Sequence, residues 1–193
     1  MFNEEEIVKI KEKAIKEHIP IIMDDTLLVL KEILEKQKPD RILEIGTAIG
    51  YSAICFAKYT NDNCTIDTIE IDEEKAFEAS VNIKDIGLNK RINVFVGNAV
   101  DILPSLDYKY DIVFIDANKG KYPLFLKEAI RLTKKNSLII ADNILYKGYT
   151  LSEYNKHKQR TAVNSLREYL KQAMINEDLE TEIIDVGDRN SCN

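Results

Sequence analysis

The sequence is poor in the residues that mark disulfide scaffolds, metal fingers and membrane proteins. Its three cysteines, Cys55, Cys64 and Cys192, are odd in number and far apart, which fits no metal-finger spacing and favours a reducing setting. No segment approaches the roughly 18–20 apolar residues that a membrane span requires. The N-terminus is charged from Glu4 onwards and lacks the apolar region of a signal peptide. We therefore expect a cytoplasmic protein without a membrane partner.

Linkers rich in Pro, Gly or Ser, internal repeats and low-complexity segments are also missing from the sequence. Hydrophobic residues make up 45% of the 193 positions, which is enough for a packed core and excludes a disordered chain. A chain of this length suits one globular unit. The sequence predicts a single domain over residues 1–193.

The net charge of −6 is unevenly distributed along the chain. Residues 119–171 contain twelve Lys and Arg but only four acidic residues, a local charge of +8, which leaves −14 for the remainder. Such asymmetry can mark a face that binds a polyanion. Long amphipathic helices with basic outer faces would give the same composition, so the asymmetry alone selects no partner.

Short apolar segments alternate with helical patterns along most of the chain. The spacing of apolar residues predicts helices at about 4–18, 24–38, 51–60, 73–87, 99–106, 121–135 and 152–176. Strand-like segments occupy 41–46, 65–72, 92–98, 111–117, 137–143 and 181–186. This alternation predicts right-handed βαβ units, and hence a doubly wound α/β domain with a mostly parallel sheet and helices on both faces.

Small or acidic residues follow most of the predicted strands. They lie at 44–50, 70–72, 97–99, 116–119 and 142–143, after five strands in a row. Ligands of an open parallel sheet bind beyond the carboxyl ends of its strands, near the switch in strand order. The recurrence of these residues predicts the functional site at that edge.

The first strand ends in E-x-G-x-x-x-G, from Glu44 to Gly50, and not in the G-x-G-x-x-G of dinucleotide-binding enzymes. Glycine at position 46 permits a tight turn and a close approach of a ligand to the backbone. The Glu44 carboxylate would repel a pyrophosphate and attract a cation. Glu70 ends the second strand, where a carboxylate can accept hydrogen bonds from both hydroxyls of a ribose. A nucleoside with a positive charge is S-adenosylmethionine; a glycine-containing turn beside an incidental glutamate is the simpler alternative.

Asp116, Asp142 and Asn143 form a second group at neighbouring predicted strand ends. Two carboxylates and an amide oxygen are hard ligands suited to Mg²⁺, and the lack of His and Cys argues against zinc. A turn or a helix cap would explain Asp142 and Asn143 if they stood alone. Lys119, three residues after Asp116, could act as a base or as a charge on a reacting oxygen. A solvated loop lysine is the alternative for that position.

Four segments of the sequence resemble the cation-dependent O-methyltransferases, the family of catechol and caffeoyl-coenzyme A methyltransferases. They are ILEIGTAIGYSA (42–53), TIEID (68–72), FIDANKGKY (114–122) and IIADNILYKG (139–148). The resemblance runs from residue 19 to residue 188 and is closest to the small bacterial branch that methylates 5-hydroxyuridine at the tRNA wobble position. It implies a Rossmann-like methyltransferase fold, N-terminal helices within residues 1–38 that cap the site, and a homodimer.

The resemblance also implies roles for individual residues. S-adenosylmethionine would be held by Met23, Glu44, Gly46, Ser52, Glu70, Gly97, Ala99 and Asp116. Mg²⁺ would be bound by Asp116, Asp142 and Asn143, and the catalytic residues would be Lys119 and Asp116. The acceptor would be the anticodon loop of a tRNA.

The chain departs from the family pattern near both ends. Its N-terminal arm is shorter than is usual in the family. Where the family continues from G-D-G into a final apolar strand, residues 187–193 read GDRNSCN. Without that strand, we expect the strand at 181–186 to lose its neighbour and to leave an exposed sheet edge.

Three alternatives stay open on the sequence alone. The same chemistry could act on a small catechol-like or phenolic molecule, against which the basic stretch 119–171 argues only weakly. A dinucleotide-dependent oxidoreductase is disfavoured because G-x-G-x-x-G is missing. A non-catalytic binding module is disfavoured because the predicted metal ligands are all present.

Overall fold

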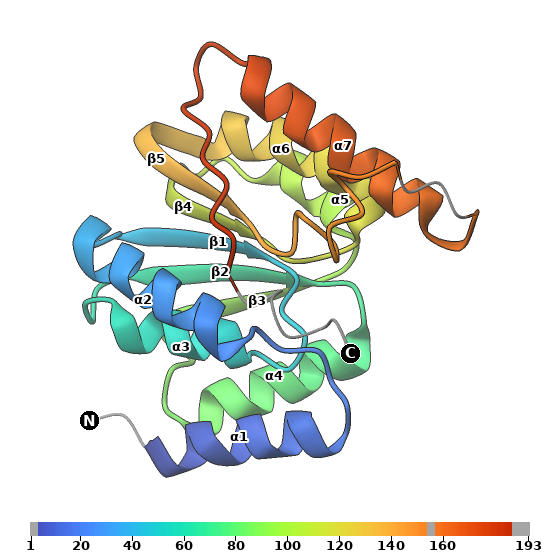
Figure 1. The fold of residues 1–193 in the computed structure, drawn as a ribbon. Helices are drawn as coiled ribbons and strands as arrows, with labels where there is room; N and C mark the ends of the chain where they lie inside the picture. The colour runs from blue at the N-terminus through green and yellow to red at the C-terminus, as the bar shows by residue number, and fades with distance from the viewer. Residues whose placement is uncertain (1–3, 154–156, 187–193) are drawn as a thin grey trace.

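The computed structural model describes residues 4–153 and 157–186, which form a parallel sheet with helices on both faces (Figure 1). The strands are β1 (Arg41–Ile45), β2 (Thr65–Glu70), β3 (Ile92–Val96), β4 (Tyr110–Ile115) and β5 (Thr133–Ala141). The α-helices are α1 (Glu4–Lys16), α2 (Asp24–Gln37), α3 (Tyr51–Tyr59), α4 (Glu73–Asp85), α5 (Ala99–Ile102), α6 (Tyr122–Leu132) and α7 (Arg160–Ile175). Three short 3₁₀ turns are η1 (Leu103–Ser105), η2 (Lys119–Lys121) and η3 (His157–Gln159). Within the described residues, no helix is both long and apolar enough to cross a membrane.

The strand order is β3-β2-β1-β4-β5, and every neighbouring pair is parallel. The chain builds outward from β1 to β3, then returns to place β4 on the other side of β1. This reversal puts the topological switch point between β1 and β4, where ligands of doubly wound sheets bind. The predicted fold class is confirmed.

Two apolar cores lie on opposite faces of the sheet. One lies among α1, α2, α3 and α4, and the other among α5, α6 and α7 (Figure 1). Successive residues of β1 alternate between them: Ile42 faces the first core, and Leu43 the second. Both are fully buried, as expected for a central parallel strand that is covered on both sides and is therefore apolar throughout.

The predicted strand at 181–186 is wrong. These residues have no regular secondary structure, and β5 is an edge of the sheet. The segment is tethered by side chains instead: Ile183 packs on the second core, and the Thr181 hydroxyl donates to the carbonyl of Ala173 at 3.0 Å. A strand exists only when a neighbour supplies backbone hydrogen bonds, so the alternating pattern by itself was insufficient. The tail 187–193 lies outside the described residues.

Two other predicted boundaries also shift. Helix α7 begins at Arg160, after the 3₁₀ turn η3, and not near residue 152; positions 154–156 of the predicted helix fall outside the described residues. Helix α6 ends at Leu132, and β5 takes over at Thr133, earlier than predicted. Lys134 and Lys135, which continued the helical pattern, are exposed residues of the edge strand.

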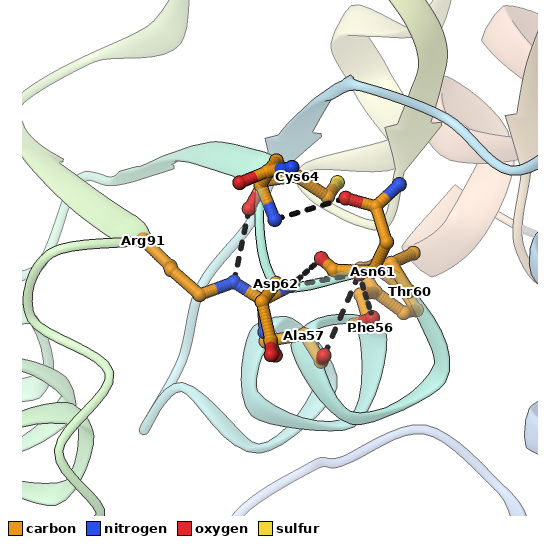
Figure 2. A network of polar contacts seen from close by, with 8 residues as sticks. Phe56, Ala57, Thr60, Asn61, Asp62, Cys64 and Arg91 are labelled. Atoms are coloured by element: carbon orange, nitrogen blue, oxygen red, sulfur yellow. Dashed lines mark hydrogen bonds and ion pairs between the residues drawn. The ribbon is translucent and has the colours of Figure 1, made fainter.

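A polar network fixes the amino ends of β2 and β3 (Figure 2). Arg91, immediately before β3, donates from Nε to the carbonyl of Cys64 at 3.0 Å and from Nη2 to the carbonyl of Asn61 at 2.7 Å. The same Nη2 lies 3.0 Å from the Thr60 hydroxyl, which in turn donates to the Phe56 carbonyl. Because this hydrogen-bond network lies at the amino ends of the strands, it leaves their carboxyl ends free for the site.

Candidate functional site

A cavity of about 430 Å³ opens at the carboxyl ends of the central strands. Six of the predicted site residues line it: Gly46, Ser52, Glu70, Gly97, Ala99 and Asp116. Residues from the segment between α1 and α2, among them Pro20 and Ile22, close part of it. The structure thus gathers residues from four strand ends and from the N-terminal segment around one space.

The turn after β1 brings two strand ends into contact. Gly46 has a φ of +107°, and a Cβ atom there would lie 2.1 Å from the carbonyl oxygen of Asp116. Any side chain would therefore collide with the backbone that follows β4. The amide of Asp116 donates to the carbonyl of Ile45 at 2.9 Å, which locks the same approach. Glycine at this position is a structural requirement of the site.

The Glu70 carboxylate is held rigidly at the end of β2. Its Oε2 accepts from the amide of Ala48 at 2.8 Å, and its Oε1 accepts from the amide of Asp72 at 3.0 Å. Asp72 is in turn the N-cap of α4, where its side chain accepts from the amides of Glu74 and Lys75. A carboxylate can accept about four hydrogen bonds, so Glu70 retains acceptor capacity toward the cavity.

Glu44 lies deeper than the sequence suggested and is not among the residues that line the cavity. Its side chain is fully buried, and Oε2 accepts from the Thr68 hydroxyl at 2.6 Å. The Thr47 hydroxyl lies 2.5 Å from that of Thr68. Because the Thr68 proton goes to Glu44, Thr47 is the donor and Thr68 the acceptor in this second hydrogen bond. Oε1 is buried and has no hydrogen-bond partner in the part of the chain that the structure describes. Burial raises the pKa of Glu44 to about 8, because it disfavours the charged form.

The predicted metal ligands come from adjacent strand ends. Asp116 follows β4 and Asp142 follows β5, and the amide of Asp142 donates to the carbonyl of Ile115 at 2.9 Å. Burial raises the pKa of Asp116, an effect that the nearby charge of Lys119 opposes. Asn143 is exposed and has a φ of +57°. Among residues 4–153 and 157–186, no cluster of three or more His, Cys, Asp and Glu could hold a metal ion, so any site here depends on the amide oxygen.

Lys119 begins the 3₁₀ turn η2 and is half-buried. Its Nζ lies 5.5 Å from the centroid of the Tyr122 ring, within the range of a cation–π contact. Lys119 does not line the cavity, whereas Lys121 does. The lysine predicted to act on the reacting oxygen therefore lies beside Asp116, outside the cavity wall.

Met23 is 63% exposed at the N-cap of α2 and does not line the cavity; its neighbours Ile21 and Ile22 do. Sequence reasoning missed Lys75 and Phe125, which also line the cavity. Both belong to helices and not to strand ends, so the rule used to find the site could not select them. Asn98, which belongs to the predicted segment 97–99, also lines the cavity.

The basic stretch 119–171 does not form one face. Lys119 and Lys121 in η2 lie at the carboxyl edge, and η2 packs against α7, which starts at Arg160. Lys134 and Lys135 instead lie at the amino end of β5, on the side of the sheet opposite the cavity. There Lys134 forms an ion pair with Asp111 at 2.7 Å. Only part of the positive charge lies near the cavity.

The profile of the O-methyltransferase family matches residues 3–190, nearly the whole chain. The chain belongs to the O-methyltransferase family. This identification confirms the family that the four sequence segments indicated; the likeness to the tRNA-methylating branch and the cation dependence stay predictions.

Relatives within the O-methyltransferase family include catechol and caffeoyl-CoA methyltransferases. A catechol O-methyltransferase of Niastella koreensis is 39% identical over 116 residues, which cover 58% of this chain and 52% of that protein. A caffeoyl-CoA O-methyltransferase of Stellaria longipes is 30% identical over 154 residues, covering 75% of this chain and 64% of that protein. The chain spans about half of the length of the first relative and less than two thirds of the second.

Solved O-methyltransferase structures share the fold over most of the chain. That of Bacillus cereus, in complex with SAH, superposes with a TM-score of 0.82 and 25% identity, covering 90% of this chain and 80% of that chain. TomG of Streptomyces achromogenes, involved in tomaymycin synthesis and solved with SAM, gives 0.81 and 26% identity, covering 90% and 79%.

Proposed function

We propose that this chain is an S-adenosylmethionine-dependent and divalent-cation-dependent O-methyltransferase. The observation that carries the proposal is the convergence of Gly46, Glu70, Gly97 and Asp116 on one cavity at the switch point. A carboxylate at the end of β2 and a glycine turn after β1 suit a nucleoside. The two O-methyltransferase neighbours solved with SAH and SAM support the same ligand class.

The methyl donor would occupy the 430 Å³ cavity. The remaining acceptor capacity of Glu70 suits the two ribose hydroxyls, and its two backbone hydrogen bonds hold it ready for them. Gly46 has no side chain, so the ligand could lie directly against its backbone. Glu44 lies behind this wall as a buried acid, and a nearby sulfonium or ammonium group would favour its ionised form.

The divalent cation would be held by Asp116, Asp142 and Asn143, because two carboxylates and an amide oxygen suit Mg²⁺ with water completing the octahedron. When bound, such a cation supplies Lewis acidity and lowers the pKa of a hydroxyl that it contacts. Beside a bound cation the ammonium form of Lys119 would be disfavoured, and the neutral amine could then take up the hydroxyl proton. As an ammonium, Lys119 would instead stabilise the charge that develops on that oxygen. The sheet edge would hold acceptor and donor in line, and orientation of this kind can contribute roughly 7–11 kcal/mol.

As acceptor we propose 5-hydroxyuridine in the anticodon loop of a tRNA. The basic residues Lys121, Lys158 and Arg160 belong to η2, η3 and the first turn of α7, and η2 packs against α7. Such a group of charges suits the phosphates of a nucleic acid. An anticodon loop presents an unstacked base without the cost of opening a duplex.

A small catechol-like phenol is the second candidate, and the names of the relatives favour it. Catechol and 5-hydroxyuracil share one chemical feature, a hydroxyl beside a second oxygen, so the same pair of metal and base could act on either. The two candidates differ in size and charge. Only the RNA would contact basic residues beyond the cavity.

The direct experiment measures transfer of a labelled methyl group from S-adenosylmethionine to hypomodified tRNA carrying 5-hydroxyuridine, and in parallel to catechol. We expect transfer to tRNA with Mg²⁺ or Mn²⁺, its loss with a chelator, and its recovery when the metal is restored. Turnover of catechol with no transfer to tRNA would replace the first acceptor with the second. Full activity in chelator would show that Asp116, Asp142 and Asn143 form a structural turn only.

A further inference from the structure

The side chain of Tyr122 joins the two strand ends that carry the predicted cation ligands. It is fully buried at the first residue of α6. Its Oη lies 2.9 Å from the carbonyl oxygen of Asp142 and 3.2 Å from that of Ile115. A phenolic hydroxyl has one proton, so the shorter contact to Asp142 is the main hydrogen bond and Ile115 is the second acceptor.

These contacts close a small ring of hydrogen bonds at the last rung between β4 and β5. The Ile115 carbonyl, which faces Oη, also accepts from the amide of Asp142 at 2.9 Å. Ile115 immediately precedes Asp116, and Asp142 is itself a predicted ligand. The Tyr122 hydroxyl therefore fixes the backbone from which both carboxylates extend.

The ring of the same tyrosine reaches the predicted base. The Nζ of Lys119 lies 5.5 Å from its centroid. The Tyr122 ring also makes an edge-to-face contact with the ring of Tyr169, at 5.6 Å between centroids and an interplanar angle of 68°. One residue thus contacts the strand ends through its hydroxyl and Lys119 through its ring.

We propose that Tyr122 is a positioning residue, which sets the geometry of the cation ligands through its hydroxyl and that of Lys119 through its ring. The inference rests on the proposed cation-dependent methyl transfer. Mg²⁺ demands nearly ideal octahedral geometry, so a small rotation of the backbone at Asp142 would be costly for binding. Groups that orient metal ligands from behind typically contribute 10- to 100-fold to metal affinity or activity.

The test compares Tyr122→Phe with Tyr169→Phe, which makes the same chemical change in the neighbouring buried ring. Mn²⁺ binding is measured by electron paramagnetic resonance, and S-adenosylhomocysteine binding by calorimetry. We expect Tyr122→Phe to bind Mn²⁺ 10- to 100-fold more weakly, with S-adenosylhomocysteine affinity within about twofold of the wild type. Tyr169→Phe should leave both affinities within about twofold of the wild type, because the Tyr122 hydroxyl is intact.

A second variant separates the hydroxyl from the ring. At saturating Mn²⁺, the kcat of Tyr122→Phe should return close to the wild-type value, because the ring still supports Lys119. The kcat of Tyr122→Leu should stay at least about tenfold lower, in line with loss of a positioned acid–base group. Equal kcat values for the two variants would remove the ring from the proposal.

Two results would overturn the role of the hydroxyl. Wild-type Mn²⁺ affinity in Tyr122→Phe would do so, as would an equal loss of Mn²⁺ and S-adenosylhomocysteine affinity, which would make Tyr122 a core residue only. If the wild type binds Mn²⁺, Asp142→Ala does not and Tyr122→Phe is unchanged, the proposed function stands and this inference fails. If the wild type binds no Mn²⁺, both fail together.

Discussion

At the scale of the residue, Glu70 is the side chain whose geometry most clearly suits a ligand. Its two oxygens are fixed by the amides of Ala48 and Asp72, so a ribose would meet a carboxylate that needs no reorganisation. Replacing Glu70 with Ala should weaken S-adenosylmethionine binding by roughly 1.5–3 kcal/mol, as for hydrogen bonds to a charged group. Calorimetry measures this loss, with Glu73→Ala, an exposed residue at the start of α4, as the matched control. Unchanged affinity in Glu70→Ala would remove the residue from the ribose role.

The buried carboxyl group of Glu44 predicts that the stability of the fold depends on pH. Its pKa is raised to about 8 in the folded chain from an ordinary value of 4.5, chiefly by burial. Between these values the folded state binds the proton and the unfolded state does not, so the contribution of Glu44 to the free energy of unfolding should fall as pH rises from about 5 to 8. One pKa unit corresponds to about 1.4 kcal/mol, so the fall should amount to a few kcal/mol. Urea titrations of Glu44→Gln should lack this component, while parallel pH slopes in variant and wild type would show that Glu44 is ionised throughout.

The strand-end rule located most of the candidate site from the sequence, because parallel strands place their carboxyl ends at one edge whatever surrounds them. That rule does not predict how deeply each selected side chain is buried. Glu44 and Gly46 both lie in the predicted segment 44–50, yet only Gly46 lines the cavity, because Glu44 belongs to the buried central strand β1. Nor could it find Lys75 and Phe125, whose place depends on how helices pack against the sheet.

At the scale of the element, the patterns predicted strands β1 to β5 and the helices between them, whereas the strand predicted at 181–186 does not form. Residues 181–186 carry a strand pattern but no strand forms, because hydrogen-bond partners are a property of the whole sheet. Helix α6 ends at Leu132, although the basic residues after it suit a helix C-terminus equally well. Local pattern fixed the type of most elements, and tertiary neighbours decided the ends.

The loop that follows β5 is braced by one residue of α7. The guanidinium of Arg167 donates to the carbonyls of Thr150 and Tyr149, each at 3.1 Å, and to that of Ser152. Arg167→Ala should therefore lower the local opening free energy of residues 144–152 by roughly 1.5–3 kcal/mol. It should also raise the KM for the acceptor without changing the affinity for the methyl donor. Hydrogen exchange by mass spectrometry measures the opening, with the exposed Lys171→Ala on the same helix as control; unchanged protection of the loop would refute the brace.

At the scale of the whole molecule, the basic residues of 119–171 lie partly at the carboxyl ends of the strands and partly at their amino ends. Lys158 and Arg160 are exposed beside the elements that carry the site, whereas Lys134 and Lys135 lie at the amino end of β5. If tRNA is the acceptor, replacing Lys158 and Arg160 with Ala should reduce the log–log salt slope of binding by about 0.7–0.9 per lost phosphate contact. The matched double variant of Lys134 and Lys135 should keep the wild-type slope. Equal slopes in the two double variants would place the RNA elsewhere or exclude it.

The central claim is that the cavity at the switch point holds S-adenosylmethionine, and a calorimetric titration of the chain with that ligand tests it most directly. We predict one bound molecule per chain, and loss of binding in Gly46→Ala, whose Cβ would lie 2.1 Å from the Asp116 carbonyl oxygen. Gly87→Ala, at a similarly positive φ but with nothing within 4 Å of the added Cβ, controls for backbone strain and should bind normally. A parallel titration with NADH should show weak or no binding. Binding of NADH more tightly than S-adenosylmethionine, or unchanged binding in Gly46→Ala, would contradict the account.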